Sequence, residues 1–276
     1  MGSLSDYAEN AWLGHLCASS YTPAATVYLA LATADPTDAG TGASMNEVAN
    51  SGNYARTALS FGAAASRAIT QNADCTFPQA SGAWGTITHW AITDTNTYGA
   101  GNVLAHGAFA SSFAPVSGNT PTVPSGEISI SITASSGEGF TTQFCNWMLD
   151  LMFRNQAYSQ PATYIALLTA AGDDADTTLT ADEVTGTSYA RVLLNKAGGV
   201  SPSWEAVSGG ACQNEEAVTF PTVGAGGWDE VVGMAIVDAA TVGNVLAFDN
   251  DQVVDQTPGE GDTVTFPIGD LDVSLT

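Results

Sequence analysis

Apolar residues at the start of the chain follow the spacing of an amphipathic helix. The pattern consists of Leu4, Ala8, Trp12, Leu13 and Leu16. Ser3 or Ser5 stands where an N-terminal cap is expected. The same pattern returns in mid-chain at Phe140, Phe144, Met148, Leu149 and Met152, with Thr141 or Thr142 near its start. We therefore predict two helices, each with one apolar stripe that must pack on another element.

The rest of the chain has the pattern of short strands. Runs of β-branched and aromatic residues are separated by Gly, Pro, Asn and Asp, which is typical of a β-sandwich or barrel. The clearest candidates are residues 26–33, 54–61, 87–93, 128–132, 164–169, 231–237 and 264–268.

These elements belong to an internal repeat. Segments recur in the same order at offsets between 135 and 144 residues: ALAT at 30–33 and ALLT at 166–169, Glu47-Val48 and Glu183-Val184, YAR at 54–56 and 189–191, TFP at 76–78 and 219–221, and GNVLA at 101–105 and 243–247. So many ordered matches indicate a tandem duplication.

We predict a mainly β protein of two tandem β-sandwich-like domains, each with an N-terminal amphipathic helix that packs on its own sheet. The first repeat covers residues 1–135 and the second covers 138–276, with the small and polar residues 134–139 as the joint.

The formal net charge of −23 restricts the possible partners. The chain has a single lysine, Lys196, and no cluster of basic residues that could bind phosphate groups, so we expect neither nucleic acid nor an anionic membrane surface as a partner. The start of the chain has no signal-peptide pattern, and we expect synthesis in the host cytoplasm. The second repeat is the more acidic, with a net charge of −17 against −6 for residues 1–136.

The motifs resemble a family of phage virion proteins usually labelled tail-fibre-like or virion structural. The resemblance rests on LSDYAEN at 4–10, YTP at 21–23, ATVYLAL at 25–31, ADPT at 34–37, YAR at 54–56, WGTITH at 84–89 and GNVL at 101–104. It covers the whole first repeat, and the second repeat keeps fewer of these motifs. The resemblance implies a structural virion protein and carries over no catalytic residue.

Few residues suggest chemistry. His15, His89 and His106 align with Leu151, Gly233 and Phe248, so the two repeats share no histidine site. The four cysteines have no close spacing, which favours buried thiols over a zinc or redox site. We expect no enzyme, no cofactor and no metal.

An acid and a base do recur. Glu47 and Arg56 stand 9 residues apart, and Glu183 and Arg191 stand 8 apart. This spacing suits two strands that meet at a hairpin, and we predict that each pair forms a structural ion pair that clamps one hairpin. The alternative is that each arginine lies over a neighbouring tyrosine or contacts a partner subunit.

Two further alternatives stay open. Acidic residues gather in two loops of the second repeat, where solvated surface is the simpler interpretation and calcium the other: Asp173, Asp174, Asp176 and Asp182, then Asp249, Asp251, Asp255, Glu260 and Asp262. Trp84 and Trp228 follow matching glycine-rich turns, where we favour burial over an exposed glycan platform.

The sequence predicts a non-enzymatic structural component of a bacteriophage virion. We expect a capsid decoration or cement protein, and the alternative is a tail, baseplate or tail-fibre component that could contact the host surface. Other virion proteins are the expected partners, and a homo-oligomer is expected because a duplicated domain suits a symmetric assembly.

Overall fold

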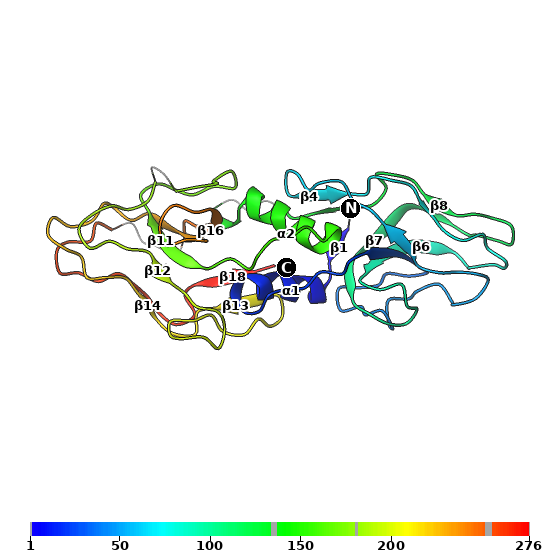
Figure 1. Cartoon of the computed structure of the whole chain (residues 1–276), viewed down its shortest axis with the longest axis horizontal. Coiled ribbons are helices and arrows are strands. Elements are labelled where there is room, and N and C mark those ends of the chain that lie inside the picture. Colours follow the sequence, from blue (N-terminus) through cyan, green and yellow to red (C-terminus); the bar gives the residue numbers. More distant parts are fainter. Residues whose placement is uncertain (1, 134–136, 180–181, 252–255, 276) are drawn as a thin grey trace. The chain divides into compact units, whose positions relative to one another are not determined.

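The computed structural model describes residues 2–133, 137–179, 182–251 and 256–275. Within these ranges the protein is mainly β, and each repeat carries one long helix (Figure 1). The predicted fold class is therefore confirmed.

Each repeat has a five-stranded antiparallel sheet and two short two-stranded ribbons. In the first repeat the sheet order is β1 (Ser3–Leu4), β7 (Val103–Phe113), β6 (Ile87–Thr93), β2 (Val27–Ala32) and β3 (Thr57–Leu59). The ribbons pair β4 (Ala68–Thr70) with β9 (Ser129–Ser131) and β5 (Cys75–Thr76) with β8 (Thr122–Val123).

The second repeat has the same topology. Its sheet order is β10 (Glu138–Phe140), β16 (Val245–Asp249), β15 (Gly233–Val237), β11 (Tyr164–Leu168) and β12 (Val192–Leu193). Its ribbons pair β13 (Ala211–Gln213) with β18 (Asp272–Ser274) and β14 (Val218–Thr219) with β17 (Thr265–Phe266). Every strand of the first repeat thus has a counterpart in the second.

The two helices begin at matching caps. Ser5 precedes α1 (Asp6–Cys17), donates its hydroxyl to the Val103 carbonyl and accepts the Ala8 N–H at 3.3 Å. Thr141 precedes α2 (Thr142–Arg154) and makes the same bonds, to Val245 O at 2.8 Å and from Phe144 N at 3.3 Å. Of the predicted alternatives, Ser5 and Thr141 are therefore the caps. Leu4 and Phe140 belong to the preceding strands.

The chain forms two compact units whose limits do not follow the repeats. One unit comprises Met1–Glu9, Thr22–Ile132 and Asn146–Tyr158, and the other comprises Asn10–Tyr21, Thr133–Cys145 and Ser159–Thr276. Each helix therefore begins in the unit that holds most of its own repeat and continues in the unit that holds most of the other repeat. The predicted repeat limits at 135 and 138 stay a prediction, and residues 134–136 lie outside the described ranges.

Contacts inside each unit show where the helices pack. In the second unit Trp12 meets the Phe144 ring edge-on at 6.1 Å, and Ala197 N–H donates to Cys17 O at 2.9 Å. In the first unit the rings of Phe61 and Phe153 lie 5.6 Å apart, and Ala64 N–H donates to Asp150 at 2.9 Å. Each helix therefore also contacts residues of the other repeat, in addition to its own sheet, on which we predicted it to pack.

The physical reason is that each helix is buried on more than one side. Residues 12–17 are all buried, and so are five of the six residues 148–153. A single sheet face covers one stripe of a helix, so such helices need neighbours on several sides. Among the described residues, no helix has the length and apolar composition needed to cross a bilayer.

Candidate functional site

The structure brings Glu47 and Arg56 together as a buried ion pair. Arg56 Nε donates to Glu47 Oε1 and Arg56 Nη2 donates to Glu47 Oε2, both at 2.8 Å. The side chain of Arg56 is 0 % exposed and that of Glu47 is 4 % exposed. The two parallel bonds give the fork geometry that makes an arginine–carboxylate pair both strong and specific.

The remaining donors of Arg56 bind backbone carbonyls of two loops. Nη1 donates to Thr95 O at 3.0 Å and to Ala100 O at 2.9 Å, while Nη2 also donates to Gly42 O at 3.1 Å. All five N–H groups of the guanidinium are therefore bonded. A buried charge of this kind is tolerated because every donor has a partner. The result is a cross-link between the loop that follows β2 and the turn between β6 and β7.

Tyr54 is a third member of this network. Its hydroxyl accepts the Leu31 N–H at 3.0 Å and donates to Glu47 Oε1 at 2.9 Å. Burial, together with the neighbouring Glu47 carboxylate, raises the pKa of Tyr54 far above its usual value. The phenol therefore stays protonated and keeps its donor role.

The segment between Glu47 and Arg56 is a loop that leaves the edge of β2 and returns to it. Glu47 pairs with Ala32, whereas Thr57 pairs with Leu29 of the same strand. The predicted hairpin of two strands is therefore wrong in its geometry. Because the loop interrupts the ladder, the Leu31 N–H lacks a strand partner on this side, and the Tyr54 hydroxyl takes that place.

The second repeat builds the same network from its own residues. Arg191 Nε and Nη2 donate to the two oxygens of Glu183 at 2.7 Å each, and Tyr189 bonds both the Leu167 N–H and Glu183. Arg191 Nη1 donates to Ala239 O at 2.7 Å and to Val242 O at 2.5 Å. Hydrogen bonding to Glu183 raises the pKa of Arg191 above its usual value. Here the carboxylate is 20 % exposed, so this pair is the less buried of the two.

Aromatic rings enclose each network. Tyr54 meets Trp84 edge-on at 5.3 Å and stacks on Phe77 at 6.3 Å. Tyr189 has the same relation to Trp228, at 5.3 Å, and to Phe220, at 6.3 Å. Both tryptophans are at most 5 % exposed, which confirms the predicted burial and leaves no exposed indole for a glycan platform at these positions.

The recurring Gly-Asn motif closes the turn that each arginine contacts. Asp94 accepts the backbone N–H and the side-chain amide of Asn102, at 2.8 and 2.7 Å. Asp238 does the same for Asn244, at 2.6 Å in both bonds. The residue before Asn244, Gly243, has φ +89° and lies against the Asp238 carboxylate. A Cβ added to it would be 2.5 Å from Asp238 Oδ1. Only glycine fits that position.

The histidines and cysteines do not assemble into a shared site. His106 lies between Asp38 and Asp35, at 2.9 and 3.2 Å, while His15 accepts the Tyr21 N–H and His89 bonds Thr88. All four cysteines lie within the described residues, are buried and form no disulfide, as predicted. Burial raises the pKa of Cys75 to about 12, so its thiolate is scarce at neutral pH.

The acidic loops of the second repeat satisfy their own backbone. Asp173 accepts the Ala175 N–H at 2.7 Å, and Asp176 accepts the Asp173 N–H at 2.8 Å. Asp255 lies outside the described residues. Within the described ranges, no group of three or more His, Cys, Asp or Glu side chains is arranged to hold a metal ion.

Sequence reasoning found the acid and the base of each network but missed the tyrosine hydroxyls and the loop carbonyls. The tyrosines were visible as part of the recurring YAR motif. The carbonyls carry no sequence signal, because any residue supplies one.

Comparison with known proteins gives one family. Residues 3–131 and 139–274 each match the model of the family described as "Podophage GP4 fiber I protein gp80". A comparison with curated protein sequences gives no match.

The match confirms three expectations: the resemblance to phage virion proteins, the non-enzymatic structural role and the assignment of the protein to the virion. It does not support the expectation of a capsid decoration protein. The family is a fibre family, which favours the tail-fibre alternative.

Proposed function

The chain belongs to the podophage GP4 fiber I protein gp80 family, and from this premise we propose that it is a structural subunit of a podophage tail fibre. The observation that carries the proposal is that both halves of the chain match the fibre model separately. One chain would then supply two copies of the fibre domain.

The geometry of the two networks suits a structural role. In each repeat one arginine joins a carboxylate to carbonyls of neighbouring loops, so the loops at that end of the sheet are held in one arrangement. A fibre domain must keep its shape outside the cell, where misplaced loops would spoil contacts with neighbouring subunits. The network therefore stabilises the loops at that end of the sheet.

We propose further that the subunit is a homo-oligomer in contact with other virion proteins. A duplicated domain lets fewer chains satisfy a ring or fibre of higher pseudo-symmetry. Light scattering on the purified chain tests this directly, because an oligomer has a mass that is a multiple of 28.1 kDa. A mass of one chain at micromolar concentration would contradict the oligomer.

Copy number in purified virions tests the fibre role. Quantitative gel densitometry against the major capsid protein should give a small number of chains per particle, as expected for a tail appendage. A copy number comparable to that of the capsid protein would overturn the proposal and restore capsid decoration.

A further inference from the structure

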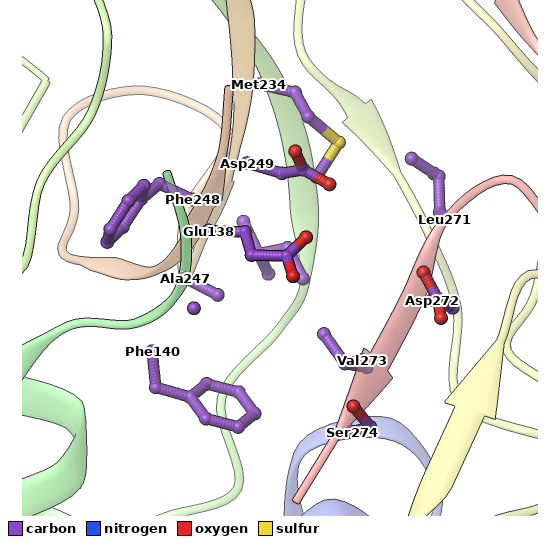
Figure 2. Close-up of a pocket in the computed structure, with 12 residues that line it drawn as sticks. Glu138, Phe140, Met234, Ala247, Phe248, Asp249, Leu271, Asp272, Val273 and Ser274 are labelled. Carbon is purple, nitrogen blue, oxygen red and sulfur yellow. The ribbon is translucent and has the colours of Figure 1, made fainter. Parts of the chain in front are cut away.

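A cavity in the second unit is lined by carboxylates and apolar side chains. Its volume is about 140 Å³. Phe140, Met234, Val273 and Leu271 supply apolar surface, while the carboxylates belong to Glu138, Asp249 and Asp272. Figure 2 shows Glu138 and Asp249 on one side and Asp272 on the facing strand, β18.

The first repeat fills the equivalent place with an indole. In the first repeat Trp90 pairs with Gly107 across the sheet. At the matching positions of the second repeat, Met234 pairs with Asp249. Trp90 is 1 % exposed, and a Cβ added to Gly107 would lie 2.6 Å from its ring. A Cβ on Gly2 would also collide with the same ring. Glycine at both positions is therefore needed to make room for Trp90.

The second repeat changes these positions together. Methionine replaces the tryptophan, Asp249 replaces Gly107, and Glu138 stands at the register position of Gly2. On the facing ribbon Asp272 stands at the position of Ser129. The exchange opens a space with three carboxylates at its rim, of which Glu138 and Asp272 are exposed and Asp249 is half-buried.

The lining selects the kind of ligand. No basic residue lines the cavity, so a cation is favoured over a neutral or anionic group. A bare metal ion does not fit, since the described residues hold no metal-binding group of three acids. The apolar walls instead suit a lysine or arginine side chain. Its aliphatic stem packs on apolar surface, while its charged head lies near the carboxylates.

A second copy of this chain is not the source that we infer, because its basic side chains already have partners. The chain has five basic residues. Arg56, Arg154 and Arg191 form ion pairs, Arg67 is buried and bonds Ile132 O, and Lys196 bonds Leu16 O.

We propose that this cavity is a docking site for a basic side chain of another protein. That the partner belongs to the virion rests on the proposed function. The chemistry of the cavity does not, because it follows from the residues that line it.

Small mimics of basic side chains test the site on the purified full chain. With ¹³C-methyl methionine labelling, n-butylammonium and n-propylguanidinium should shift the Met234 methyl signal in a saturable way and leave Met45, in the first repeat, unmoved. The neutral analogue n-butanol should bind at least fivefold more weakly, and butyrate should not bind.

Two variants separate charge at the site from net charge. Asp249→Asn with Asp272→Asn should weaken butylammonium binding at least fivefold. Glu230→Gln with Glu260→Gln removes the same charge from exposed positions elsewhere in the second repeat and should leave binding unchanged. The proposal fails if Met234 does not respond to either cation, if butanol binds as tightly, or if both variants behave alike. None of these outcomes depends on where the protein sits in the virion.

Discussion

At the scale of single residues, the two arginine networks differ in burial while sharing their chemistry. Removing one partner of a buried pair leaves an uncompensated charge, which costs about 3–5 kcal/mol. Arg56→Leu leaves the 4 % exposed Glu47 without its partner and should lower the free energy of unfolding by roughly that amount. Urea denaturation measures the change.

Arg191→Leu is the matched comparison. Glu183 is 20 % exposed and can regain water when its partner is removed. Arg191→Leu should therefore lower the free energy of unfolding clearly less than Arg56→Leu does. Equal losses in the two variants would show that burial of the carboxylate does not set the cost.

Glu9 is a second residue with a measurable consequence. Burial, then the nearby Asp38 and Asp6, raise its pKa to about 7 from an ordinary 4.5. The folded state therefore holds the proton more tightly, and this contribution to stability is present below pH 4.5 and lost as the pH rises through 7. Glu9→Gln should match the wild type at pH 4.5 and exceed it in stability at pH 8.

Denaturation at these two pH values gives the readout, with the exposed Glu127→Gln as control. A Glu9→Gln variant that gains nothing at pH 8 contradicts the assignment.

How far the sequence predicts these residues depends on whether they form a pattern. Glu47 and Arg56 could be predicted because they recur as Glu183 and Arg191 in a chain with few bases. Their hairpin geometry could not, because spacing alone does not distinguish two paired strands from a loop that rejoins the strand it left.

At the scale of elements, the helix caps fix where each helix begins. Ser5 and Thr141 each bond a first-turn N–H and a carbonyl of the adjacent sheet. Ser5→Ala and Thr141→Ala should each lower the free energy of unfolding by about 1–2 kcal/mol, because both bonds are lost. Ser3→Ala, at the exposed residue of β1, should have almost no effect. A loss for Ser3→Ala as large as for Ser5→Ala would contradict the assignment of the cap.

Predicted strands correspond to observed ones at β2, β3, β6, β9, β11, β15 and β17. The longest strand, β7, was missed because its sequence, VLAHGAFASSF, is rich in small residues and has weak alternation. The contacts of the helices with the other repeat were also missed. The apolar stripe identifies only some of residues 12–17 as buried, whereas all six are buried.

At the scale of the whole molecule, two repeats of one topology have kept one network and diverged elsewhere. The Glu–Tyr–Arg constellation recurs in both repeats, whereas Trp90 and Met234 mark a place where one repeat is packed and the other is open. A shared fold with a specialised second copy is the pattern expected of a duplicated structural domain that has gained a contact of its own.

The position of the chain in the virion distinguishes a tail-fibre subunit from a capsid protein. A cryo-EM reconstruction of purified particles should place density for both repeats in a tail fibre, with none on the capsid shell. Density for this chain on the capsid surface, repeated with the capsid lattice, would contradict the account.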